Sequence, residues 1–112
     1  MTYSEYGLKF VGCREGDSRH HFIIDCYNKM VTPLPRNYKV TYRDSWCATF
    51  VSYILVSCNA VNPPVECSCY YMRDKARKNN QIVTSPRIND IVMYDWDGNT
   101  SPDHVGIITN IR

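Results

Sequence analysis

The chain has 112 residues, of which 44% are hydrophobic and 21% are charged. This composition suits one folded domain and excludes an intrinsically disordered protein. The longest mostly apolar run, residues 48–56, is far shorter than the roughly 20 residues of a membrane span, so no membrane insertion is expected. The formal net charge of +2 is too small to indicate a nucleic-acid partner.

Six cysteines raise the question of disulfides or metal ligands. Residues 1–12 contain no basic stretch followed by an apolar core, so we expect no signal peptide. The six thiols are therefore expected to be free, as is usual in a reducing compartment. Cys67-x-Cys69 lacks the second ligand pair of a structural zinc site, and we expect neither a metal nor a cofactor.

Three helices are predicted, in chain order, from apolar residues at three- and four-residue steps. They cover about 18–30, 45–58 and 68–79. Asp17 or Ser18 is the expected N-cap of the first helix, and Asp44 or Ser45 is that of the second. The second helix is the most apolar, so we expect it to be central and buried on most sides.

The same spacing predicts which side chains these helices bury. The first helix is expected to bury a stripe made of Phe22, Ile23, Cys26, Tyr27 and Met30. The third helix is expected to turn three residues inwards, Tyr71, Met72 and Ala76. Its Lys and Arg residues then form a solvated face.

Two strands follow, at about 90–96 and 104–111, where strand-forming residues are frequent. Turn residues at 97–99 join them into a hairpin with an extended tip. Asp95-x-Asp97-x-Asn99 has the spacing of calcium ligands, but Gly106 stands where a bidentate Glu would be needed. Helices followed by strands predict an α+β fold rather than a β-α-β repeat.

Cys47 is the candidate nucleophile, because it lies in the first turn of the central helix. Unpaired backbone N–H groups and the helix dipole favour an anion there. A thiol in this position is acidified, and the thiolate is the reactive form. The same N–H groups, above all that of Cys47 itself, can receive a developing oxyanion.

A thiolate nucleophile needs a base, and the chain has three histidines. His20 and His21 lie in the first helix and are expected to be exposed or to cap it. His104 begins a strand directly after a turn, from which its ring can reach a helix N-terminus. Asp103 cannot orient that ring, because neighbouring strand residues face opposite sides. The residues alone leave Cys47 open between a buried small side chain and a nucleophile paired with His104.

Three motifs carry a resemblance to a known family. Residues 46–52 (WCATFVS), 89–98 (NDIVMYDWDG) and 103–108 (DHVGII) resemble the nucleophile, strand and histidine motifs of the CHAP family, the cysteine, histidine-dependent amidohydrolases/peptidases. EGDS at 15–18, upstream of these motifs, and ECSC at 66–69, between the first and the second, resemble phage-encoded members from Gram-positive hosts. The resemblance covers about 12–111.

The resemblance implies a papain-like fold in which the nucleophile helix packs on a C-terminal antiparallel sheet. It implies hydrolysis of a peptidoglycan amide bond, by an N-acetylmuramoyl-L-alanine amidase or by a stem or cross-bridge endopeptidase. Cys47 would be the nucleophile and His104 the general base and acid. A phage or prophage protein of this kind stays in the cytoplasm until it is released to the cell wall.

The sequence also departs from the family pattern. Asn89 replaces the usual Gly, and residues 37–44 lack the acidic calcium loop of some members. The polar residue that orients the histidine lies on a further strand in the family, and Asn110 is too far along the strand to replace it. We therefore expect 1–112 to be a single CHAP-like domain without its last strands, with an open sheet edge through which a homodimer could form.

Two alternatives remain open at this point. One is a catalytically weak or inactive CHAP-like module that binds wall peptide or serves a structural role. The other is a different papain-like cysteine peptidase. Asp25-Cys26 shares two residues with the D-C-S-G motif of NlpC-type peptidases but lies on another helix.

Overall fold

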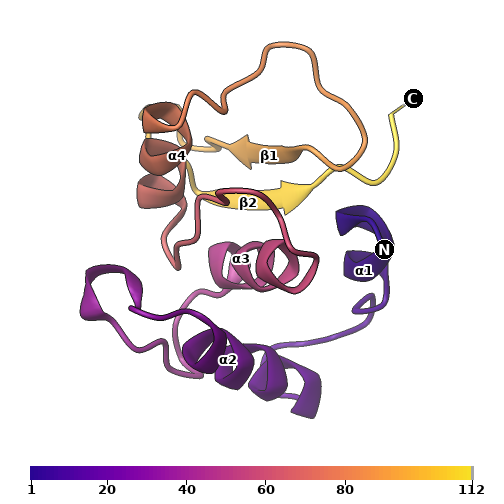
Figure 1. The fold of residues 1–112 in the computed structure, drawn as a ribbon, viewed down its shortest axis with the longest axis vertical. Coiled ribbons are helices and arrows are strands. Elements are labelled where there is room, and N and C mark those ends of the chain that lie inside the picture. The colour runs from indigo at the N-terminus through magenta and orange to yellow at the C-terminus, as the bar shows by residue number, and fades with distance from the viewer. Residues whose placement is uncertain (112) are drawn as a thin grey trace.

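Helix α3 (Cys47–Ser57) lies at the centre of the molecule (Figure 1). The computed structural model describes residues 1–111. Helix α2 (Ser18–Met30) covers one side of α3, and a hairpin of β1 (Ile91–Tyr94) and β2 (His104–Ile107) covers the other. The result is an α+β arrangement of helix, central helix and small sheet.

Three smaller elements complete the fold. Helix α1 (Tyr3–Leu8) and helix α4 (Cys69–Lys78) flank the central helix, and η1 (Pro35–Asn37) is a short 3-10 turn. Helix α1 was not predicted from the sequence. The signal was present in Thr2-x-x-Glu5, because these two side chains form a capping box at the start of the helix.

Helix α3 is buried on most sides, as predicted. Residues Val51 and Ile54 are completely inaccessible, and each contributes about 1.5–3 kcal/mol by leaving water. Two polar side chains in α3, Thr49 and Ser52, are equally buried. Only Ser52 among them has a hydrogen-bond partner in the described part of the chain, and that partner is the backbone of Glu66.

Helix α2 has the predicted boundaries and the predicted Asp17 cap, whose Oδ1 accepts from the His20 N–H at 2.9 Å. Its buried face differs from the expected stripe: it consists of His20, Ile23, Ile24 and Tyr27. These positions follow the i, i+3, i+4, i+7 pattern of one helix face. Phe22 and Met30 therefore point outwards, and both are exposed.

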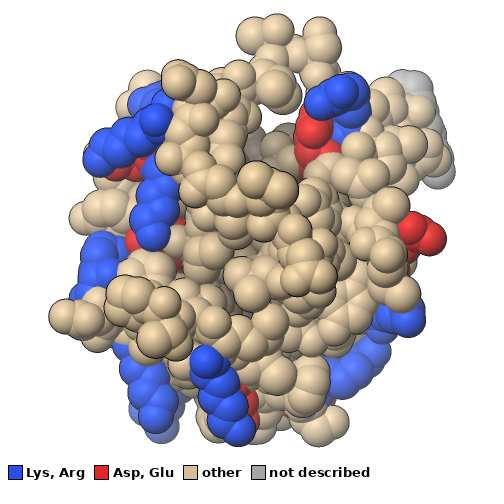
Figure 2. Space-filling model, viewed as in Figure 1, with Lys and Arg blue, Asp and Glu red and all other residues tan. Residues whose placement is uncertain are grey.

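Helix α4 is nearly as predicted, and only Met72 is fully buried in it. Tyr71, which was expected inside, is exposed, and the guanidinium of Arg36 lies over its ring at 4.4 Å. The basic residues of α4 make separate contacts: Lys75 with the Val65 carbonyl and Lys78 with Asp74. On the face shown in Figure 2, the basic side chains lie around the rim.

The hairpin is antiparallel, with Ile91 opposite Ile107 and Tyr94 opposite His104. Both strands are shorter than predicted, and β2 ends at Ile107 rather than Ile111. In the tip, both carboxylate oxygens of Asp95 accept from backbone N–H groups, those of Asn99 and Thr100, at 3.2 and 2.7 Å. The predicted turn is therefore correct, and Asp95 stabilises it.

A buried carboxylate connects α3 with the segment that precedes α4. Glu66 is 1% exposed, and its Oε1 accepts from Arg36 Nη2 at 2.7 Å and from the Cys67 N–H at 2.9 Å. The Ser52 hydroxyl donates to the Glu66 carbonyl at 2.7 Å and accepts from the Glu66 N–H at 2.9 Å. Burial raises the pKa of Glu66, but Arg36 and the Cys67 amide outweigh it, so the pKa lies below 4.5.

We predict that Glu66→Gln lowers the free energy of unfolding by about 2 kcal/mol at neutral pH, because it removes a charge-assisted hydrogen bond. The folded-state pKa of Glu66 lies below its unfolded value of 4.5. The stabilisation that ionised Glu66 contributes to the folded state is therefore fully present above pH 4.5. It is lost as the pH falls through the folded-state pKa. Urea unfolding of both proteins from pH 7 to pH 3 measures the difference.

Asp74→Asn is the matched control, because Asp74 forms an exposed pair with Lys78 on the same helix. Such a pair contributes less than about 0.5 kcal/mol. Equal losses for the two variants, or a Glu66→Gln difference that persists at pH 3, would contradict this role for Glu66.

Candidate active site

Cys47 is the first residue of α3, and the N-terminus of this helix has no side-chain cap. The prediction that Asp44 or Ser45 caps this helix was wrong, because the N-cap residue is Trp46. The Asp44 carboxylate instead accepts from the Tyr38 hydroxyl at 2.7 Å and from the Thr41 N–H at 2.8 Å. The first backbone N–H groups of α3 therefore remain available to an anion beside the Cys47 sulfur.

A second sulfur lies next to Cys47. The Sγ of Cys69 is 3.3 Å from the Sγ of Cys47. Cys69 is the first residue of α4, so each thiol is held at the start of a helix. Cys69 belongs to a motif quoted above but was given no role there. A single sequence does not show that the N-termini of these two helices lie side by side.

This arrangement makes Cys47 acidic. The hydrogen bond from the Cys69 thiol is the main cause that lowers the pKa of Cys47 to about 5. Burial acts in the opposite direction, and the Val105 amide and the His104 side chain lower the pKa further. The pKa of Cys69 is raised, first by its contact with Cys47 and then by burial. The two opposite shifts favour a negative charge on Cys47 while Cys69 keeps its proton.

His104 is the first residue of β2 and lies close enough to Cys47 to lower its pKa. Its ring stacks on Trp96, with centroids 5.3 Å apart and an angle of 13° between the rings. The ring of Tyr94, opposite on β1, lies 5.8 Å away. These aromatic contacts restrict the orientation of the imidazole. Neither Trp96 nor Tyr94 was predicted to have this role.

Two polar residues near His104 in the sequence do not orient it. The Oδ2 of Asp103 accepts from the backbone N–H groups of Trp96 and Asp97, at 2.8 and 3.2 Å. Asn110 is exposed and lies beyond the end of β2. The rings of Trp96 and Tyr94 therefore lie beside the imidazole, where a polar partner was expected.

The two other histidines contact different groups. His20 was expected to be exposed or to cap the helix, but it is completely buried, 4.6 Å from the Trp46 ring. Its Nδ1 accepts from the Gly16 N–H at 2.9 Å, which ties the preceding turn to α2. His21 stacks on Tyr42 at 3.9 Å. Neither histidine is among the groups that shift the pKa of Cys47.

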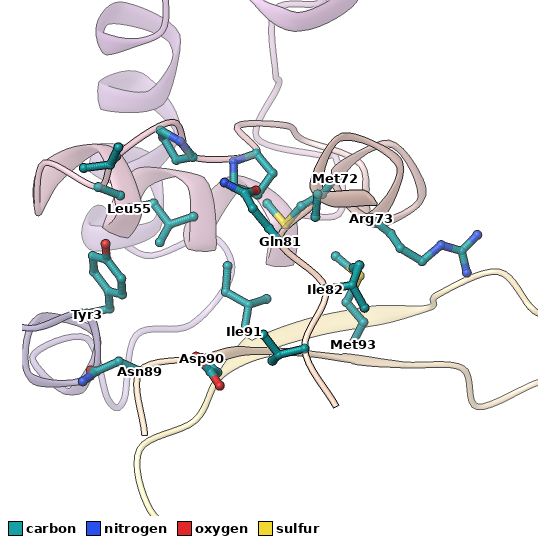
Figure 3. A pocket seen from close by; sticks show the side chains of 16 residues that line it. Tyr3, Leu55, Met72, Arg73, Gln81, Ile82, Asn89, Asp90, Ile91 and Met93 are labelled. Atoms are coloured by element: carbon teal, nitrogen blue, oxygen red, sulfur yellow. The ribbon is translucent and has the colours of Figure 1, made fainter. Parts of the chain in front are cut away.

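A cavity of about 470 Å³ lies between α3, α4, β1 and residues 81–83 (Figure 3). Leu55, Met72 and Ile91 give it an apolar lining. Neither Cys47 nor His104 lines it. A second hollow of about 250 Å³ is lined by Ser45 and Cys67, which lie two residues from Cys47 and Cys69 respectively, and by Arg36 and Asp44.

Asn89 stands where the motif that this segment resembles has Gly, and its backbone has a conformation that Gly also adopts. Asn89 has φ of 79°, in the left-handed region that Gly adopts freely and Asn adopts more readily than most residues. Its Oδ1 also accepts from the Ser4 N–H at 2.9 Å, which fastens α1 to the start of the hairpin.

Within residues 1–111, no group of three or more His, Cys, Asp or Glu side chains is arranged to hold a metal ion. None of the helices in that range is long and apolar enough to cross a membrane. No family model, curated protein or solved structure matches this chain. The chemistry of the site is therefore inferred from its residues and their geometry.

We predict that Cys47 is alkylated by iodoacetamide with a pH midpoint near 5, whereas ordinary thiols have midpoints near 8.5. Cys69→Ala is expected to raise the Cys47 midpoint more than His104→Ala does, because Cys69 is the larger cause of the lowered pKa. Mass spectrometry after brief alkylation from pH 4 to pH 9 gives the midpoint of each cysteine.

Cys58 provides an internal control, because its sulfur has only a distant contact with the Thr2 carbonyl, at 3.9 Å. Its rate of alkylation at a fixed pH is expected to be equal in the unmodified chain and the two variants, because neither substitution removes that contact. A Cys47 midpoint above 8 in the unmodified chain would show that the acidic thiol does not form.

The stacking of His104 on Trp96 also has a measurable signature. The carbon-bound ring protons of His104 are expected to be shifted upfield in the proton NMR spectrum by the ring current of Trp96. Trp96→Ala is expected to move them towards the positions of a free histidine. Tyr42→Ala is the matched control, because it removes the ring on which His21 stacks. Unchanged His104 resonances in Trp96→Ala would contradict the stacked geometry.

Proposed function

We propose that this chain is a peptidoglycan hydrolase that cleaves an amide bond of the bacterial cell wall by a Cys–His mechanism. The observation that carries the proposal is the acidic Cys47 thiol at the uncapped start of the buried helix α3, with His104 beside it. The motifs around these residues, which resemble those of CHAP enzymes, give the proposal its substrate class. A papain-like relationship is part of the same proposal.

In the proposed reaction, the Cys47 thiolate attacks the carbonyl carbon of the scissile amide. The resulting oxyanion accepts from the Cys47 N–H, which no side chain occupies. His104 gives a proton to the leaving amine and then removes one from the water that hydrolyses the acyl-enzyme. Trp96 and Tyr94 restrict the imidazole during both steps.

The hollow lined by Ser45 and Cys67 has a lining that suits the polar part of such a substrate. Arg36 and Asp44 bring opposite charges to it, and a wall peptide carries both carboxylates and amines. Both side chains already have protein partners: Arg36 binds Glu66, and the Oδ2 of Asp44 accepts from the Tyr38 hydroxyl and the Thr41 N–H. A substrate group would therefore bind beside these contacts. We assign this hollow to the peptide side of the scissile bond.

Cys47→Ser and His104→Ala are expected to reduce the rate of wall hydrolysis by about 10³-fold or more, because each removes a partner of the reaction. Cys26→Ala is the control, since Cys26 lies on α2, which packs against the opposite side of α3 from the hairpin. The measurement is the release of new amino groups from purified peptidoglycan, followed by labelling and identification of the new N-termini.

The labelled products also separate the remaining possibilities. A new N-terminal L-alanine indicates an amidase, and any other new N-terminus indicates an endopeptidase. Wall binding without hydrolysis, unchanged in Cys47→Ser, would overturn the proposal in favour of a binding module. Hydrolysis of unrelated peptides at equal rates would favour a general cysteine peptidase instead.

A further inference from the structure

The contact between Cys47 and Cys69 has a consequence beyond acidifying one thiol. Among the sulfur contacts of residues 1–111, this one joins two sulfurs, at 3.3 Å. The Cys13 and Cys58 thiols contact oxygen atoms, of Asp17 and Thr2. A disulfide bond has an S–S distance of about 2.05 Å, so the two sulfurs need to approach by only about 1.3 Å to form one.

We infer that Cys47 and Cys69 form a reversible disulfide bond, with a small-molecule disulfide as the oxidant, and that the site is active only as the dithiol. The bond itself depends only on the two sulfurs. The loss of activity rests on the function proposed above. Cys69 is then the resolving thiol of a redox-sensitive active site.

The chemistry follows in two balanced exchanges. The Cys47 thiolate attacks one sulfur of the oxidant RSSR, which forms a mixed disulfide and releases RS⁻. Cys69 loses its proton to RS⁻ and attacks the Cys47 sulfur, which forms the Cys47–Cys69 bond and releases a second RS⁻. That thiolate takes a proton from water, so one RSSR becomes two RSH as the protein dithiol is oxidised.

The environment of Cys69 favours this order. Its pKa is raised mainly by the contact with Cys47, so Cys69 stays protonated while Cys47 carries the charge. Once Cys47 is in a mixed disulfide, that contact no longer holds a negative charge. The start of helix α4 then favours the Cys69 thiolate, directly beside the sulfur that it attacks.

Cys67 is the competing thiol, because it lies two residues from Cys69. Its sulfur contacts Arg36 Nη2 at 3.5 Å and Glu66 Oε1 at 3.6 Å. Burial and the charge of Glu66 raise the pKa of Cys67, which keeps its reactive thiolate scarce. Cys67 is therefore expected to remain a thiol while the Cys47–Cys69 bond forms.

The test uses the full reduced chain with oxidised glutathione at pH 7, followed by N-ethylmaleimide to block the remaining thiols. Cleavage after Glu66 separates Cys47 from Cys69, and chymotrypsin then separates Cys47 from Cys26 and Cys58. The expected product is a crosslink between the Cys47 peptide and the peptide 67–70, in which fragmentation places N-ethylmaleimide on Cys67 and the disulfide on Cys69. Dithiothreitol removes the crosslink. A stable glutathione adduct on Cys47, or a crosslink between any other pair, would overturn the inference.

Two variants make the result specific. Cys69→Ser is expected to stop at the glutathione adduct on Cys47, because the resolving thiol is absent. Cys67→Ser is the matched control and is expected to form the crosslink at the rate of the unmodified chain. A Cys69→Ser protein that still forms an internal disulfide with Cys47 would also overturn the inference.

The mass measurement separates this inference from the proposed function. A chain that forms the crosslink but never hydrolyses peptidoglycan supports the disulfide and contradicts the hydrolase. A chain that hydrolyses peptidoglycan but forms no crosslink contradicts the disulfide alone. Where both hold, oxidation is expected to remove at least about 90% of the hydrolysis rate, and dithiothreitol is expected to restore it.

Discussion

The buried carboxylate of Glu66 is the constraint on which the candidate site depends. A charge in this position is costly unless every lone pair is satisfied, and here Arg36, the Cys67 amide and Ser52 of α3 surround the residue. These bonds hold residues 66–67 against α3. Since α4 begins at Cys69, the same bonds determine where the second sulfur lies.

Helix α3 combines high burial with an incomplete end. Its apolar residues form much of the core, whereas its N-terminus has no side-chain cap. A cap contributes about 1 kcal/mol, and a side-chain oxygen in that place would compete with any anion for the same N–H groups. The apolar core therefore offsets the stability that the uncapped N-terminus of α3 lacks. Proteins commonly offset a locally unfavourable reactive site in this way.

The sequence predicted the parts of the fold that depend on local pattern. The 3.6-residue period identified α2, α3 and α4, and the strand formers on either side of Gly98 identified the hairpin. The errors concern competing partners. Asp44 was expected to cap α3, but the Thr41 N–H and Tyr38 hydroxyl take its carboxylate.

The candidate site was predictable in part for the same reason. Cys47 and His104 stand out because each lies at the start of an element, and their proximity follows from α3 packing against β2. Cys69 and Trp96 could not be assigned, because their contacts with Cys47 and His104 join distant segments. His20 was a missed local signal, since it completes the i, i+3, i+4, i+7 face of α2.

The two halves of the site belong to parts of the molecule that differ in how firmly they are held. Cys47 starts the most buried helix, whereas His104 lies on a hairpin of two short strands with an exposed tip, attached to α4 through Arg73 and the Thr100 carbonyl. Regions with few buried contacts open locally at a lower free energy than the core. The amide protons of Val92 and Gly106, which pair across the hairpin, would then exchange with solvent well before those of Val51 and Ile54. Each such opening would separate the imidazole from the sulfur while the helical core stays folded.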